Sequence, residues 1–213
     1  MGLLSLLYKD PVTFLLLAGL LLYSVIAHEV AHGLMAYFFG DDTAKRSGRL
    51  TLAPLSHLSP IGTLMLFLAG FGWAKPVPVN FARLSHGRLG LFSVSLAGCA
   101  TNILIATVAI FLYQFENVRS LPFLAKALPI LATINIMLGA FNLIPIPPLD
   151  GSKVLMSFLP ENTQRAMMKI EPYGFFILLL LLFTGLLNPI ILFMRNILYI
   201  LIGVLFRFFH LLN

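Results

Sequence analysis

Long apolar segments recur along this chain, and they limit it to folds in which helices cross a membrane. A helix needs about 20 apolar residues to cross a bilayer, and four of the six segments reach that length comfortably. Only 10% of the residues are charged, against about 25% in soluble domains. The sequence therefore predicts an integral membrane protein. The segments lie at about 11–39, 59–74, 88–115, 121–145, 173–187 and 189–212.

No polar stretch between these segments is long enough to fold as a soluble domain, so residues 1–213 are expected to form a single domain. We predict an all-α polytopic membrane protein with about five to six transmembrane helices. The last two apolar segments are separated only by Asn188 and Pro189. Over about 172–212 they are expected to form a helical hairpin or one broken helix.

Two stretches between the apolar segments have the pattern of extended chain. Residues 48–54 alternate polar and apolar side chains and end at a proline, which is typical of a strand. Residues 76–80 contain two prolines, and each proline keeps the residue before it out of the helical conformation. The two stretches are expected to form a small β-hairpin or sheet at the membrane surface, with one unpaired edge.

The net charge of +6 has two explanations, a nucleic-acid-binding surface or basic residues that flank transmembrane helices. The second is favoured, because Lys and Arg concentrate in the loops at 40–58, 75–88 and 150–171, and basic loops of this kind face the cytoplasm. All three loops can lie on one side only if segment 59–74 does not cross the bilayer. We therefore expect 59–74 to be a re-entrant segment and the amino terminus to be outside. No nucleic-acid partner is expected.

The most informative motif is His28-Glu29-Val30-Ala31-His32, inside the first apolar segment. Ionisable groups are costly at bilayer depth unless they have partners, so two imidazoles and a carboxylate need a cause. Histidines four residues apart project from one helix face and can bind one metal ion. Glu29 is then placed to act on a metal-bound water, which predicts one zinc ion per chain. A buried proton relay is the alternative explanation.

A catalytic zinc site usually has three protein ligands, so a third must come from elsewhere in the chain. Asp150 follows a run of three prolines that ends the 121–145 segment, and Gly151 permits a sharp turn that would present the carboxylate to the bundle interior. With 59–74 re-entrant, Asp150 also lies on the same side of the membrane as both histidines. The alternatives are that Asp150 is only a helix cap or turn residue, or that His57 is the third ligand. The other candidates are His86, Glu116, Glu161 and Glu171.

These motifs, in this order, resemble the site-2 protease family of intramembrane zinc metalloproteases. The resemblance rests on His28-Glu29-x-x-His32, on Asn142-x-x-Pro145 and on Leu149-Asp150-Gly151. The stretches at 48–52, 60–63 and 72–80 look like the compact bacterial and archaeal branch, without a PDZ module.

The resemblance covers about residues 20–160, and it implies a three-helix catalytic core within about 11–160. It also implies that His28, His32 and Asp150 are the zinc ligands. By the same resemblance, Glu29 is the catalytic acid/base.

The chain departs from the family pattern in two places. A Gly-Pro-x-x-Asn pattern in the middle core helix reads Gly98-Cys99-Ala100-Thr101-Asn102 here, so the proline is missing and Asn102 is kept. The polar residues that often flank His57 are replaced by Ala53 and Ser59.

The reaction that these residues imply is peptide hydrolysis. Zinc would lower the pKa of a water toward about 7, and Glu29 would accept its proton and later deliver it to the departing amine. Asn142 is the candidate hydrogen-bond donor to the oxyanion, with Asn102 and His57 as further candidates. The alternative role of both asparagines is to hold helices together.

A scissile peptide must be extended, because a helix hides its carbonyls in its own hydrogen bonds. The edge near residues 48–53 could hold such a segment by β-addition. The expected substrates are single-span membrane proteins or remnant signal peptides, cut in or near the bilayer during regulated proteolysis or signal-peptide clearance. The expected location is the cell membrane of a bacterium or archaeon, with the active site toward the cytoplasm.

The alternative function is a non-catalytic metal-binding membrane protein that holds transmembrane helices. The presence of Glu29 argues against it, because a metal binder needs only ligands. A small transporter is a third possibility, but this sequence lacks the internal symmetry that transporter halves show.

Overall fold

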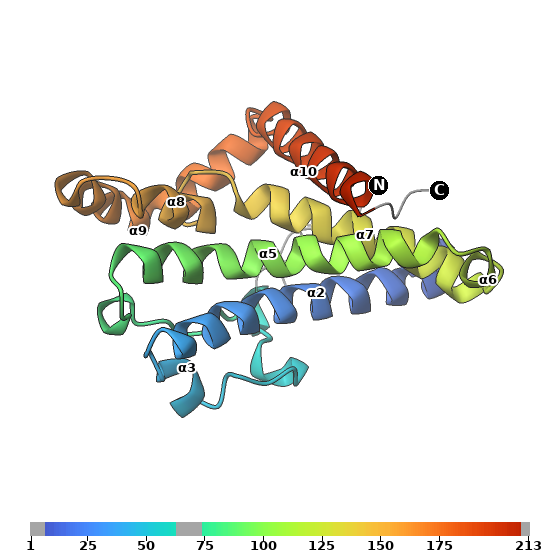
Figure 1. The fold of residues 1–213 in the computed structure, drawn as a ribbon, viewed down its shortest axis with the longest axis horizontal. Helices are drawn as coiled ribbons and strands as arrows, with labels where there is room; N and C mark the ends of the chain where they lie inside the picture. The colour runs from blue at the N-terminus through green and yellow to red at the C-terminus, as the bar shows by residue number, and fades with distance from the viewer. Residues whose placement is uncertain (1–6, 63–73, 210–213) are drawn as a thin grey trace.

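In the computed structural model the protein is almost entirely helical over residues 7–62 and 74–209, which are the residues that the structure describes (Figure 1). Five of the described helices are long and apolar enough to cross a membrane, as expected of an integral membrane protein. They are α2 (Pro11–Phe38), α5 (Arg88–Tyr113), α7 (Pro122–Asn142), α9 (Glu161–Phe183) and α10 (Asn188–Phe208). The shorter elements are α3 (Thr43–Arg46), η1 (Pro54–Ser56), η2 (Phe81–Arg83), α6 (Glu116–Arg119) and α8 (Asp150–Met156).

The apolar segments at 11–39, 88–115 and 121–145 form α2, α5 and α7, as predicted. Local signals set where two of these helices begin. Asp10 caps α2 by accepting a hydrogen bond from the Thr13 N–H at 3.0 Å. Prolines occupy the first turns of α2 and α7, where their missing N–H groups leave no helical hydrogen bond unmade.

Helices α2, α5 and α7 pack side by side as a three-helix bundle (Figure 1). The ammonium of Lys126 lies 3.1 Å from the Asp10 carboxylate, so the first turns of α2 and α7 share one end of the bundle. At the other end, the Ser85 N–H donates to the Phe39 carbonyl at 2.7 Å, which places the start of α5 beside the end of α2. Helix α5 therefore runs antiparallel to α2 and α7. We call the end with Phe39 and Ser85 the Phe39 end.

The carboxy-terminal part of the chain differs from the sequence prediction. The sequence predicts a loop up to residue 171 and a short apolar segment after it, whereas α9 begins at Glu161 and continues through Pro172. Hydropathy alone misses the first half of α9, because polar residues are mixed with apolar ones there. Helix α10 follows after a short turn, and its buried face packs against α5 and α7.

The predicted β-hairpin is absent from the part of the chain that the structure describes. Residues 48–53 are irregular and lead into η1, and the isolated antiparallel bridge found among the described residues joins Leu58 to Ala74, outside both stretches. The connection is made by a side chain instead, because the buried Arg49 donates to the Lys75 carbonyl at 2.7 Å. The predicted re-entrant segment 59–74 lies mostly outside the described residues and stays a prediction.

Asp41, just after α2, ties the segment 76–80 to the bundle. Its buried carboxylate accepts hydrogen bonds from the Thr43 N–H at 3.1 Å and from the Asn80 N–H at 2.7 Å, and the Thr43 hydroxyl also donates to it. Burial opposes ionisation, but the hydrogen bonds from Thr43 and Asn80 outweigh it and hold the pKa of the Asp41 carboxyl below its usual range. Asp41 therefore contributes to local stability in its charged form.

We expect Asp41→Asn to loosen segment 76–80, because an amide offers one acceptor oxygen where the carboxylate offers two. The expected local cost is about 1–3 kcal/mol. In the wild-type protein this contribution is complete above the unfolded-state pKa of about 3.9 and is lost as the pH falls below it, since the folded-state pKa is depressed. Hydrogen exchange of the amides at 76–80, measured in detergent at several pH values, reports this local stability.

The control for this prediction is Asp42→Asn. Asp42 is the neighbouring carboxylate, but it is partly exposed and pairs with Arg46 and Arg83 on the surface. Surface pairs contribute little, so exchange at 76–80 should stay near that of the wild type. Equal protection in Asp41→Asn and in the wild type would show that Asp41 is not the anchor.

Candidate metal centre

His28 and His32 lie in the half of α2 nearest Phe39, and both are buried, with exposures of 6% and 8%. Their spacing of four residues puts them on one face of the helix, and that face is turned toward α5. The two Nε2 atoms are 3.1 Å apart. The imidazoles therefore direct their outer nitrogens to one point inside the bundle.

Helix α5 comes close to both imidazoles at Gly98. A Cβ atom at this position would lie 2.4 Å from the His32 Nε2 and 2.6 Å from the His28 Nε2, closer than any real contact. Only glycine leaves the room that both nitrogens occupy. Gly98 is thus part of the site, although it has no side chain to contribute.

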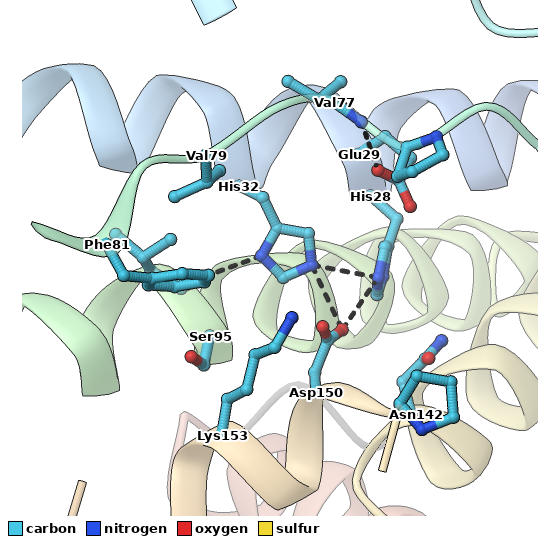
Figure 2. A pocket seen from close by; sticks show the side chains of 13 residues that line it. His28, Glu29, His32, Val77, Val79, Phe81, Ser95, Asn142, Asp150 and Lys153 are labelled. Carbon is cyan, nitrogen blue, oxygen red and sulfur yellow. Dashed lines mark hydrogen bonds and ion pairs between the residues drawn. The ribbon is translucent and has the colours of Figure 1, made fainter. Parts of the chain in front are cut away.

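Asp150 begins α8, and its carboxylate points at the two histidines (Figure 2). Its Oδ2 lies 3.0 Å from the His28 Nε2 and 3.1 Å from the His32 Nε2. Helix α8 is held against the preceding loop at Gly151, where a Cβ would lie 2.2 Å from the Leu143 carbonyl oxygen. Gly151 therefore permits α8 to pack closely against the Leu143 carbonyl, and because Gly151 is helical, the sequence-based expectation of a sharp turn at this residue is wrong.

The electrostatic setting of Asp150 favours a charged ligand. Burial opposes ionisation, but the hydrogen bonds and charges of His28 and His32 outweigh it and hold the pKa of the Asp150 carboxyl far below its usual range. A metal ligand must be deprotonated, and Asp150 meets that condition at neutral pH.

The three side chains fit a zinc ion by distance. Tetrahedral zinc with bonds of about 2.0–2.2 Å needs ligand atoms about 3.3 Å apart. The separations among the Nε2 atoms and the Asp150 Oδ2 are 3.0 to 3.1 Å, which is close to that requirement. Among the described residues, His28, His32 and Asp150 form the group of His, Cys, Asp and Glu that could hold a metal ion.

The inner nitrogen of each imidazole has a partner that suits metal binding. The His28 Nδ1 lies 2.6 Å from the Asn102 Oδ1, and the His32 Nδ1 lies 2.7 Å from the Val94 carbonyl oxygen. An acceptor at Nδ1 favours the tautomer that leaves the Nε2 lone pair free. The contacts of the two Nδ1 atoms and the positions of the two Nε2 atoms are therefore both suited to one metal ion.

Glu29 lies beside this group and lines the same cavity, which has a volume of about 270 Å³ (Figure 2). Its Oε2 accepts a hydrogen bond from the Val77 N–H at 2.9 Å. Val77 belongs to the extended segment 76–80, which forms one wall of the cavity, and Asn142 and Lys153 lie across the cavity from it. The cavity thus combines three potential metal ligands with an adjacent carboxylate.

The other sequence candidates divide into two groups. Asn142 lines the cavity, and its Nδ2 donates to the Leu138 carbonyl at 3.0 Å. Asn102 is fully buried behind His28 and is not among the residues that line the cavity. His57 is also fully buried, with its Nε2 2.8 Å from the Thr51 carbonyl oxygen, and it too lies outside the cavity lining.

Sequence reasoning misses three residues that shape the site. Lys153 follows Asp150 by one helical turn and lines the cavity, so its spacing was a usable signal. Asn135 hydrogen-bonds to Asn102, and a polar residue within an apolar segment was a signal as well. Gly98 has no such signal, because its role depends on how closely α5 approaches α2.

Comparisons with known proteins agree with this geometry. Residues 118–185 match the model of peptidase family M50. The chain is 40% identical to "Putative zinc metalloprotease YwhC" of Bacillus subtilis (strain 168) over 173 residues, which cover 78% of this chain and 79% of the relative. It is 31% identical to "Putative zinc metalloprotease Rip2" of Mycolicibacterium smegmatis, over 83% of this chain and 70% of the relative.

An archaeal relative is more distant. Zinc metalloprotease MJ0392 of Methanocaldococcus jannaschii is 27% identical over 67% of this chain, but the match covers 34% of that protein. No solved structure gives a significant match. The extent of the similarity to the bacterial zinc metalloproteases, together with the family match, shows that this chain belongs to peptidase family M50, the site-2 protease family of zinc metalloproteases.

Proposed function

We propose that this protein is a zinc endopeptidase that hydrolyses peptide bonds in or near the transmembrane segments of membrane proteins. The observation that carries the proposal is the convergence of His28, His32 and Asp150 in one cavity, with Glu29 at its edge. The site lies within the helical bundle, so a substrate backbone has to reach it at membrane depth or near the surface. Metal binding by itself would not require the glutamate.

The chemistry divides between the metal and the protein. Zinc, when bound, polarises a carbonyl group and lowers the pKa of water to about 7. Glu29 would accept a proton from the attacking water and transfer it to the amine that leaves. The Val77 N–H holds one oxygen of Glu29, and this hydrogen bond orients the carboxylate beside His28.

Asn142 is the proposed donor to the developing oxyanion. One N–H of its amide is used by the Leu138 carbonyl, and an amide nitrogen has two hydrogens. The second hydrogen can therefore serve a substrate oxygen without breaking the existing bond. Lys153 adds a positive charge to the same cavity, which favours negative charge on the substrate oxygen.

The proposed substrates are single-span membrane proteins or remnant signal peptides. A helical segment cannot present its carbonyls to the site, because they are hydrogen-bonded within the helix. The cavity of about 270 Å³ holds a few residues and not a helix, so the substrate has to unwind locally. This requirement favours substrates whose transmembrane segments unwind easily.

We expect Glu29→Gln to lower the cleavage rate strongly while zinc stays bound. Replacing the carboxylate removes the proton carrier but none of the three ligands, so the cleavage rate should fall about 100- to 10,000-fold. Purified protein in detergent would be incubated with a panel of single-span proteins and signal peptides, and mass spectrometry would locate the cut. Metal analysis of the same sample measures zinc per chain.

Asp150→Ala is the matched variant, because it removes a ligand and keeps Glu29. About one zinc per wild-type chain, and much less in Asp150→Ala, is the expected result. Unchanged zinc content in that variant would exclude Asp150 as the third ligand. Zinc binding without cleavage of any substrate would favour a non-catalytic protein that holds transmembrane helices.

The space at Gly98 gives a second prediction for the metal centre. Gly98→Ala should displace both imidazoles and weaken zinc binding, since the new methyl group would collide with each Nε2 atom. Gly19→Ala is the control, because a Cβ at Gly19, also on a transmembrane helix, meets no atom within 4 Å. Zinc affinity is measured for both by competition with a chelator. Equal affinities in the two variants would contradict the assignment of Gly98 to the site.

We propose that the Phe39 end of the bundle faces the cytoplasm, so that the site opens toward that side of the cell membrane. Basic residues are concentrated in the connections at that end and are sparse at the other end. The Phe39-end residues are Lys45, Arg46, Arg49, Lys75, Arg83, Arg88, Lys153, Arg165 and Lys169. Lys9, Arg119 and Lys126 are at the other end, and Arg195 and Arg207 lie within α10.

Cysteine labelling tests this orientation, because Cys99 is the single cysteine and is buried. In a Cys99→Ala background, Ser47→Cys and Asn117→Cys place one exposed thiol at each end of the bundle. A membrane-impermeant maleimide should label Asn117→Cys in intact cells and Ser47→Cys only after permeabilisation. The reverse pattern would invert the proposed topology.

A further inference from the structure

A chain of hydrogen bonds leads from His28 away from the metal centre and into the bundle. The His28 Nδ1 lies 2.6 Å from the Asn102 Oδ1 on α5. The Asn102 Nδ2 donates to the Asn135 Oδ1 on α7 at 2.8 Å, and the Asn135 Nδ2 donates to the Ser24 hydroxyl on α2 at 2.8 Å. The chain thus visits all three helices of the bundle and returns to the helix on which it began.

The members of this chain are isolated from solvent. Asn102 and Asn135 have no exposed surface, and Ser24 is 2% exposed. In such surroundings an unpaired donor or acceptor is costly, so each group keeps its partner. Each amide therefore has one orientation that satisfies its neighbours.

The direction of the chain is set at its far end by backbone carbonyls, which can only accept. The Asn135 Nδ2 also donates to the Leu131 carbonyl at 2.9 Å, and the Ser24 hydroxyl gives its proton to the Leu20 carbonyl at 2.7 Å. Asn135 must therefore present its NH₂ group to Leu131 and Ser24, and its oxygen to Asn102. The opposite orientation would place the Asn135 oxygen against a carbonyl oxygen.

The orientation of Asn135 determines the orientation of the Asn102 amide, which contacts His28. Because Asn135 offers an oxygen, Asn102 must present its NH₂ group to Asn135 and its oxygen to His28. The oxygen can accept only from a protonated Nδ1. An imidazole that keeps a proton on Nδ1 leaves Nε2, the atom that faces Asp150 and His32, as the nitrogen that can bind a metal. Without a metal, a proton on Nε2 is donated to the Asp150 carboxylate.

His32 also keeps a proton on Nδ1, and here the acceptor is a backbone carbonyl in direct contact with the imidazole. The His32 Nδ1 lies 2.7 Å from the Val94 carbonyl oxygen, which is itself a pure acceptor. Among the described residues, the partner of the His28 Nδ1 is the Asn102 side chain, so His28 depends on the two amides. The Val94 carbonyl therefore acts on His32 directly. The Leu131 carbonyl has the same effect on His28 through two intervening side chains.

We propose that Asn135 is a positioning residue for His28, whose Nδ1 it keeps protonated through Asn102. The inference deepens the proposed zinc site and rests on it, but the proton on Nδ1 can be observed in the metal-free protein. Asn135 is not among the residues that line the cavity, and its hydrogen bonds reach His28 through Asn102. Its effect is to determine which nitrogen of His28 is available to bind zinc.

The competing explanation is that these polar side chains only hold the helices together. Two substitutions separate the explanations. Ser24→Ala removes the hydrogen bond between α7 and α2 but leaves the Leu131 carbonyl to orient Asn135. Asn135→Leu keeps a side chain of similar size but removes the group that orients Asn102, which is then free to turn its NH₂ group toward His28.

The first measurement uses the wild-type protein without metal. Nitrogen-15 NMR of histidine-labelled protein distinguishes the two neutral tautomers and the imidazolium, and the His28 signals are identified by their loss in His28→Gln. We expect a proton on the His28 Nδ1, either in the neutral Nδ1 tautomer or in the imidazolium that pairs with Asp150. A His28 that is protonated at Nε2 alone would overturn the proposal, whether or not the protein binds zinc or cleaves peptides.

The second measurement is zinc affinity by chelator competition. Asn135→Leu should weaken zinc binding about 10- to 100-fold, the usual effect of removing a residue behind a metal ligand. Ser24→Ala should bind zinc nearly as the wild type does. The same is expected of Thr133→Val, which removes an exposed hydroxyl on α7, the helix that carries Asn135. Wild-type affinity in Asn135→Leu, or an equal loss in Ser24→Ala, would overturn the proposal. Absence of zinc from every protein would count against the proposed function, and the tautomer result would still decide this inference.

Discussion

The structure depends on one constraint, which is that a polar group inside an apolar helical bundle must have a partner. The two imidazoles meet it with one another, with the Asp150 carboxylate and with acceptors at each Nδ1. Asn102 and Asn135 meet it by joining α5 to α7. These hydrogen bonds satisfy the buried polar groups and also fix their orientation. The same contacts therefore permit burial and arrange the side chains so that they could hold a metal ion.

The second requirement is close approach between backbones. Gly98 lets α5 reach the imidazoles, Gly151 lets α8 pack against the Leu143 carbonyl, and Gly174 lets α9 lie against the Pro147 carbonyl. A Cβ at any of these positions would meet an atom at 2.6 Å or less. Asp150 comes from a short helix between these contacts, and therefore its position is defined by packing on both sides. A carboxylate so held can serve as a ligand without first being ordered by the metal.

The sequence predicts the parts of this architecture that depend on composition and local spacing. Apolar length predicts α2, α5 and α7, and the four-residue spacing of His28 and His32 predicts their shared face. The pairing of those histidines with Asp150 follows from the topology and the family resemblance. The prediction of a sheet is wrong because the alternating stretch 48–54 has no strand partner among the described residues. Its connection to the neighbouring segment is a hydrogen bond from the Arg49 side chain. The roles of Gly98 and Asn135 depend on how helices distant in the sequence approach one another, which no local pattern records.

The wall of the cavity opposite Asp150 is built by a different principle from the ligands. Segment 76–80 has no strand partner among the described residues, and it is held by hydrogen bonds from its backbone to two carboxylates of the α2 region. Glu29 accepts from the Val77 N–H, and Asp41 accepts from the Asn80 N–H. Hydrogen bonds to backbone N–H groups do not depend on side-chain identity. Substitutions of Val79 or Phe81, which line the cavity, can therefore change its shape while the backbone of the wall stays in place. The three proposed ligands are therefore fixed by buried side-chain contacts, whereas the surface that a substrate would meet can vary while the position of Glu29 is kept.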